Sequence, residues 1–242
     1  MKKYTQKTIG FYMAIGFGLA LFSSARADFL ITYNFNSASN TPLLSSIVTG
    51  TDAASVDGED FTAPGNASVS GTTDTAFINT QYVSNTEALS LETAHYFSLT
   101  ISAINPGEFV NLDSFSFEFG GSNNDSGTSF TSNVIVQSSV GGFNTGNPML
   151  DVTPSSKVIP YTSGSLTFSS ATVDVSDSAF DNLDTIEFQF RFHDGGEDST
   201  NTFVRLDNIV FAGSVIPEPS SMLLVLSGVL AFGLIRRGKN GK

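Results

Sequence analysis

The side chains best suited to catalysis or metal binding are few in this sequence of 242 residues. It holds two histidines, His95 and His193, and no cysteine. Two histidines cannot complete a typical four-ligand zinc site unless carboxylates join them. His193 opens the segment His193-Asp194-Gly195-Gly196-Glu197-Asp198, whose three carboxylates are oxygen ligands of the kind that suits a hard cation. The spacing matches no EF-hand loop, so a solvated turn is the simpler interpretation.

The arrangements that enzymes use for hydrolysis are sparse. Serine nucleophiles require a neighbouring base, and no Gly-x-Ser-x-Gly turn occurs. Glycoside hydrolysis requires two carboxylates that face each other across a groove. Glu118 and Glu187 both lie opposite to the apolar positions of their predicted strands and are one such candidate pair. The sequence therefore favours a non-catalytic protein, and a secreted polysaccharide-active enzyme (a glycoside hydrolase or lyase) is the alternative.

Alternating apolar residues predict the strands that position these side chains. The period of two marks half-buried strands, and it occurs in four segments: 28–37, 96–102, 113–120 and 185–193. Turn-rich segments rich in Gly, Asn and Ser separate the predicted strands. The pattern predicts an all-β fold, with one antiparallel β-sandwich of jelly-roll type over residues 28–215. The chain has 22 Phe and no Trp, which indicates that its aromatic residues build the core.

Charge is distributed unevenly along the chain. Residues 28–215 hold 22 acidic residues but only three basic ones, Lys157, Arg191 and Arg205, so this region has a net charge of −19. Such a domain repels nucleic acid, because nucleic-acid affinity depends on Lys and Arg neutralising phosphates. Its surface attracts divalent cations, although ordinary solvation by acidic side chains is the simpler interpretation of the composition.

The N-terminal 27 residues have the three parts of a secretory signal peptide. Lys2, Lys3 and Lys7 form a basic region, and an apolar run follows over residues 9–22. Small residues then stand at Ala25 and Ala27, the two positions that signal peptidase reads, so we expect cleavage between Ala27 and Asp28.

The C-terminus pairs an apolar run with a basic end. Residues 220–235 contain no charge, and Arg236, Arg237, Lys239 and Lys242 follow. A run of this length is slightly short of the roughly 20 residues of a comfortable membrane helix, so a short anchor and a processing signal are both consistent with it. Basic residues stay on the cytoplasmic side, which places residues 28–215 outside the inner membrane.

This end resembles the PEP-CTERM sorting signal of exported proteins from Gram-negative bacteria that make exopolysaccharide. The matching residues are Pro217-Glu218-Pro219, the apolar run and Arg236-Arg237. The resemblance implies recognition and cleavage by exosortase, a transmembrane intermediate, and a final place in the cell envelope, on the outer surface or in the matrix. The two prolines hold the motif extended, which a processing enzyme needs.

Two strands of the ectodomain resemble bacterial jelly-roll domains of the galactose-binding and carbohydrate-binding-module types. They are the first, Leu30-ITYNFNS, and the last, Arg205-LDNIVFAG, in which the apolar positions change parity between Asp207 and Asn208, as at a β-bulge. In many such domains the Asp of the last strand helps to bind a structural calcium beside the first strand. The resemblance thus implies a calcium site at Asp207, where Asn34 and Asn36 stand in place of the expected acidic ligand.

These observations predict a surface or matrix protein whose sandwich contacts exopolysaccharide or other matrix components. Sugar rings stack on exposed aromatic side chains, and of the tyrosines in this region only Tyr96 has clear outward parity, because Tyr33 has core parity. The expected partners are signal peptidase and exosortase during export, the membrane before processing, and no nucleic acid.

Overall fold

The protein is described from a computed structural model. The described residues are 27–35, 47–50, 53–59, 62, 68–70, 77–81, 86–87, 91, 96–123, 129–140, 142–143, 150–159, 167–194 and 202–217. The predicted signal peptide up to Arg26 and the C-terminal apolar run lie outside them. Within the described ranges, no helix is both long enough and apolar enough to cross a membrane.

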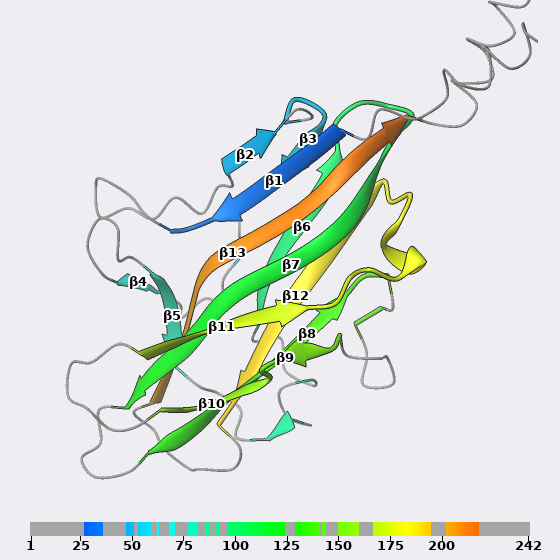
Figure 1. The fold of residues 1–242 in the computed structure, drawn as a ribbon. Helices are drawn as coiled ribbons and strands as arrows, with labels where there is room; N and C mark the ends of the chain where they lie inside the picture. Colours follow the sequence, from blue (N-terminus) through cyan, green and yellow to red (C-terminus); the bar gives the residue numbers. More distant parts are fainter. Residues whose placement is uncertain are drawn as a thin grey trace, which may run out of the picture.

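Two antiparallel sheets pack face to face (Figure 1). The larger sheet has the strand order β2-β1-β13-β7-β11-β9, with β5 also paired to β13 and β4 paired to β5. Its strands are β1 (Ala27–Tyr33), β2 (Ile47–Gly50), β4 (Ser68–Ser70), β5 (Phe77–Gln81), β7 (Glu108–Asn123), β9 (Val152–Thr153), β11 (Thr167–Val173) and β13 (Thr202–Pro217).

The smaller sheet has the order β10-β8-β12-β6-β3. Its strands are β3 (Val56–Gly58), β6 (Phe97–Ala103), β8 (Phe130–Ser138), β10 (Ser156–Ile159) and β12 (Thr185–His193), and one short 3-10 helix, η1 (Ser178–Phe180), precedes β12. From β6 to β8, and again from β11 to β13, successive strands alternate between the sheets. The predicted antiparallel β-sandwich is confirmed, and all four segments of alternating apolar residues form strands.

The core between the sheets is aromatic. Phe115 of β7 lies at its centre, with ring centroids 4.1 Å from Phe211 of β13 in a stacked arrangement and 5.2 Å from Phe188 of β12. The inward residues of each strand are almost fully buried, whereas their neighbours point to the outer faces. This alternation confirms the predicted role of Phe in the core. It also places the outward residues of β13, β7 and β12 on the outer faces of the sandwich, where they can form binding sites.

Strand β13 organises the larger sheet because it has neighbours on both sides along its length. On one side β7 accompanies it from Thr202 to Pro217. On the other side β5 pairs with its first half, up to Leu206, and β1 pairs with its second half, from Ile209 onward. The change of partner therefore falls at Asp207 and Asn208.

Candidate functional site: a carboxylate pair at the β13 bulge

A β-bulge interrupts β13 at the change of partner. Asp207 pairs with Glu118 and Val210 pairs with Ser116, so two residues of β13 stand opposite Phe117 alone. Asn208 has φ of 47°, in the left-handed region that Asn tolerates better than most residues. The extra residue keeps both Leu206 and Ile209 in the core, as the change of parity in the sequence predicts.

The bulge leaves two carboxylates side by side on the outer face of the larger sheet. Asp207 is only 9% exposed and lies directly across from Glu118. The amide of Asn208 links them, because its backbone N–H donates to Asp207 Oδ1 at 2.8 Å and its Nδ2 donates to Glu118 Oε2 at 2.9 Å. The pKa of Asp207 is raised to about 7, mainly by burial and to a smaller extent by the charge of Glu118, against the lowering effect of the hydrogen bond from Asn208.

This arrangement favours a proton or a cation between the two groups, because ionising both of two neighbouring carboxylates in a buried place costs free energy. The pair thus suits a hard cation in charge and ligand type. Among the residues that the structure describes, however, no group of three or more His, Cys, Asp or Glu side chains surrounds a common point. Neutral oxygens would have to complete a calcium site here.

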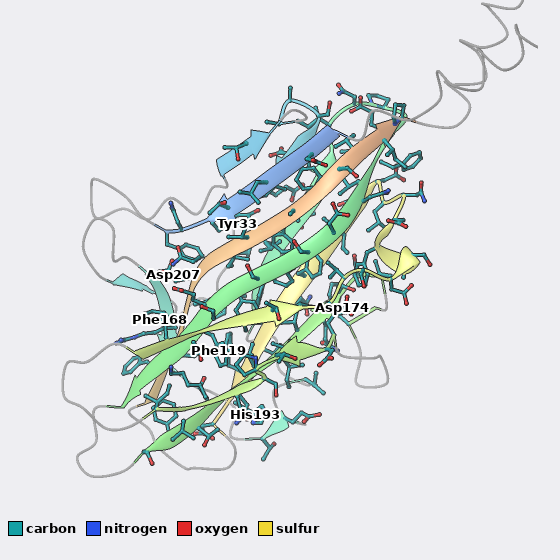
Figure 2. The ribbon with its side chains drawn as sticks, viewed as in Figure 1. Tyr33, Phe119, Phe168, Asp174, His193 and Asp207 are labelled. Carbon is teal, nitrogen blue, oxygen red and sulfur yellow. The ribbon has the colours of Figure 1, made fainter. Side chains whose placement is uncertain are left out.

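The residues predicted to share this site are placed only in part. Strand β1 ends with Tyr33 opposite Ile209 of β13, and Asn34 is the next residue of the chain after this last pair. Figure 2 shows Tyr33 and Asp207 on these neighbouring strands. Asn36 lies outside the described residues. Sequence reasoning missed Glu118 as the partner of Asp207, since only the register of β7 against β13 reveals it.

The pair considered for glycoside hydrolysis does not form. Glu118 belongs to β7 of the larger sheet and Glu187 belongs to β12 of the smaller one. Each points away from the core that lies between the sheets, so the two carboxylates occupy opposite outer faces of the sandwich. The predicted catalytic pair is therefore wrong. The parity of a residue determines which face of its strand it occupies, but it does not determine which sheet the strand joins.

The outer face of the smaller sheet carries a connected row of polar side chains along β12. Arg191 Nη2 donates to Gln189 Oε1 at 2.8 Å, and Gln189 Nε2 donates to Glu187 Oε1 at 3.1 Å. The guanidinium of Arg191 lies 4.5 Å from the ring centroid of Tyr96, a cation–π contact. Arg191 is 4% exposed, and burial lowers its pKa. Tyr96 faces outward, as predicted, and its ring packs against the guanidinium of Arg191.

All three basic residues of the domain are withdrawn from the surface. Arg191 is buried, and Lys157 and Arg205 are half-buried. Lys157 Nζ donates to the backbone carbonyl of Phe168, and burial lowers the pKa of Arg205 to about 10. In the part of the chain that the structure describes, the fully exposed charged side chains are all carboxylates. The acidity inferred from composition is thus concentrated at the surface.

The two ends of the domain meet at one end of the larger sheet. Ala27 at the start of β1 pairs with Val215 of β13, and Pro217 at the end of β13 pairs with Glu108. Figure 1 shows the start of β1 beside the end of β13. The remaining residues of the predicted cleavage and sorting signals lie outside the described ranges: Ala25, Glu218, Pro219, Arg236 and Arg237. His95 also lies outside them.

Comparisons with known proteins give a loose likeness in fold. No protein-family model and no curated protein matches the chain. The carbohydrate-binding module TmCBM27, described for specific mannan recognition, superposes with a TM-score of 0.36 and 7% identity over 76% of this chain and 98% of its own. The CBM22-1 xylan-binding domain of Paenibacillus barcinonensis Xyn10C gives 0.36 and 9% identity over 76% of this chain and 94% of its own.

A third structure is the C-terminal family 22 carbohydrate-binding module of Clostridium thermocellum Xyn10B. It has a TM-score of 0.33 and 16% identity over 64% of this chain and 86% of its own. Likeness at this level carries no argument about ligand or activity.

Proposed function

We propose that the chain is an exported, non-catalytic surface or matrix protein of a Gram-negative bacterium, sorted through its C-terminus. One observation carries the proposal: the pairing of Ala27 with Val215 brings the predicted signal-peptide junction and the start of the sorting motif together. Both predicted membrane-directed segments then leave the sandwich at one point. A domain held in this way presents its opposite end to the exterior while both segments lie in one membrane.

The boundaries of β1 and β13 indicate where the expected cleavages would fall relative to the sheet. β1 includes Ala27, and β13 includes Pro217, so the ordered sheet reaches into both predicted signals. Signal peptidase would cut at the first residue pair of β1 and β13. Exosortase would act at the residue where β13 ends. The mature protein would then consist of the sandwich with almost no extension at either end.

The intact mass and cell fraction of the protein from its native host test this proposal. We expect a species that begins at Asp28, ends within residues 217–219 and is found outside the inner membrane. A species that still ends at Lys242 in the inner membrane would show a simple anchor and overturn the sorting function. Replacing Pro217-Glu218-Pro219 by three alanines is the matched variant, and it should retain the full C-terminus.

We also propose a structural calcium ion at Asp207, with Glu118 as the second carboxylate and Asn34 and Asn36 as neutral ligands. The ion would supply the positive charge that two adjoining carboxylates lack. Adding Ca²⁺ to chelator-treated protein should raise Tm by about 2–8 °C, corresponding to stabilisation by about 1–2 kcal/mol. Asp207→Asn should abolish this shift, whereas Asp113→Asn, an exposed carboxylate elsewhere on the larger sheet, should preserve it. No heat of binding and no shift would refute the ion.

The alternative of a polysaccharide-active enzyme now depends on the Asp207–Glu118 pair, since a carboxyl group with a pKa near 7 suits acid–base chemistry. Asp207 is nearly buried, and it lines neither of the two cavities identified among the described residues. A substrate would need another route to it. This position favours a structural role for the pair.

A further inference from the structure

A cavity of about 470 Å³ lies beside the outer face of β8, within the size range of small-molecule sites. His193 and Asn133, paired across β12 and β8, form one wall with Ile135. Glu87 and the segment that contains Leu150 and Asp151 form the other. We call it the His193 pocket. Figure 2 shows His193 at the end of the sandwich opposite to the one from which β13 leaves.

Backbone hydrogen bonds fix the walls of this pocket. Leu150 N–H donates to Val136 O at 3.0 Å, and Val134 N–H donates to Ser155 O at 2.9 Å, so the segment with Asp151 is tied to β8 on both sides. Asn133 Nδ2 donates to the carbonyls of Thr131 and His193, each at 3.3 Å. The amide is thus held in one orientation, and the part of the pocket made by β8, β12 and residues 150–155 is formed before any ligand arrives.

The charge of the pocket is negative. Glu87 and Asp151 are exposed carboxylates on its rim, and the described residues that line it include no Lys or Arg. Burial lowers the pKa of His193, whereas the charge of Glu87 raises it. Because burial is the larger effect, the imidazole is mainly neutral at pH 7 and does not offset the carboxylates. The imidazole can accept or donate a hydrogen bond, and the amide of Asn133, whose two N–H donors bond to backbone carbonyls, can accept one through Oδ1.

Both walls of the pocket also carry apolar side chains. Ile135 and Leu150 are two of them, and Ile135 is 6% exposed. A ligand with one apolar surface, several hydroxyl groups and a positive charge would complement all three features. Sugar rings present a carbon-bound hydrogen face and hydroxyl groups, and an amino sugar adds an ammonium group.

We propose that the His193 pocket binds a polysaccharide that carries free amino groups, such as a partly deacetylated amino-sugar polymer. The inference rests on the proposed surface or matrix function and names its ligand class. The exposed carboxylates of the rest of the described domain would reinforce it, because they repel anionic polymers and attract cationic ones. The two rim carboxylates would pair with the ammonium groups, and Asn133 and His193 would bind hydroxyl groups.

Calorimetry with two oligosaccharides of equal length tests this inference on the purified mature chain, Asp28 to Pro217, after its folding is verified by circular dichroism. The probes are glucosamine hexasaccharide and its fully N-acetylated counterpart at neutral pH and low salt. We expect the free-amine probe to bind at least about tenfold more tightly, a difference of about 1.4 kcal/mol. Equal affinity for the two probes, or no binding of the free-amine probe at millimolar concentration, would overturn it.

Charge-neutralising variants locate the site. Glu87→Gln and Asp151→Asn should each weaken binding of glucosamine hexasaccharide about fivefold. Asp113→Asn makes the same change of charge on the other sheet and should leave the affinity unchanged. A loss with Asp113→Asn as large as that with Glu87→Gln would show non-specific attraction to the domain and refute the pocket. Tighter binding of a lysine hexapeptide than of the hexasaccharide would instead identify a basic protein segment as the ligand.

The failure of this inference is distinguishable from the failure of the proposed function. A protein that is processed and exported as expected, but that binds neither oligosaccharide, would disprove the ligand class alone. An unprocessed protein retained in the inner membrane would disprove the sorting function, whatever its affinity for sugars.

Discussion

Phe115→Ala should lower the free energy of unfolding by about 3–5 kcal/mol, the usual range for truncating a buried Phe. Phe115 is 2% exposed and its ring contacts rings from both sheets: Phe211, Phe188, Phe190 and Phe117. Its removal opens a cavity that strands on both sides border and that the sheets cannot collapse to fill. Since small domains have a total stability of about 5–15 kcal/mol, this loss threatens folding at growth temperature.

Urea unfolding followed by circular dichroism measures this effect. Phe115→Leu is the graded variant, because it keeps most of the volume, and its loss should be less than half as large. Val158→Ala is the control on an edge strand, where the side chain is 63% exposed, and it should change stability by less than about 0.5 kcal/mol. Similar losses for Phe115→Ala and Val158→Ala would contradict an aromatic core between the sheets.

Asp207→Asn should stabilise the calcium-free protein at pH 8 by about 2 kcal/mol and reduce the dependence of its stability on pH. Burial raises the pKa of Asp207 from its ordinary value of 3.8 to about 7 in the folded state. The folded protein therefore holds this proton more tightly than the unfolded chain does. The contribution of Asp207 to the free energy of unfolding is greatest below about pH 4, falls as pH rises from 4 to 7 and then levels off.

The magnitude follows from the size of the shift. One pKa unit corresponds to about 1.4 kcal/mol, and the partial solvation of Asp207 reduces the full amount to about 2 kcal/mol. The measurement is urea unfolding of both proteins in EDTA at pH 5 and pH 8. Asn resembles the protonated acid, so the gain in stability from Asp207→Asn should be clearly smaller at pH 5, where the fall is only partly complete, than at pH 8. Equal pH profiles for the two proteins would rule out the buried acid.

A matched control for the titration is Asp174, an exposed carboxylate. Hydrogen bonds from the hydroxyl and backbone N–H of Ser176 lower the pKa of this group, so its contribution has the opposite sign. Asp174→Asn should lose a little stability above pH 4 and none below its folded pKa. A gain at pH 8 with Asp174→Asn would show that removing any negative charge stabilises the domain, which would leave Asp207 without a special role.

Much of the fold could be read from the sequence because the strands are half-buried. The alternating Phe, Ile and Leu of β1, β6, β7 and β12 mark one face of each strand, and burial of that face predicts a sandwich. The change of parity at Asp207 and Asn208 predicted the bulge, since the bulge must keep Leu206 and Ile209 on the same side. These are local patterns, and local geometry determines them.

The site could be predicted only in part, because it depends on pairing between distant segments. Nothing near Glu118 in the sequence indicates that it lies opposite Asp207. Its parity alone is equally consistent with Glu187 as its partner. The His193 pocket likewise needs Glu87, Asn133 and Asp151, which come from three separate segments. Register and strand order, which no local periodicity contains, bring these residues together.

The position of β13 between β1 and β7 determines how the domain would bear a load. If the unprocessed protein is held at the membrane through the end of β13, a pull away from the membrane loads this strand along its length. Its hydrogen bonds to β7 and β1 lie across that direction, so they would be strained together in shear. The strand that ends at the predicted sorting motif is thus also the one whose removal would require most of the larger sheet to break at once.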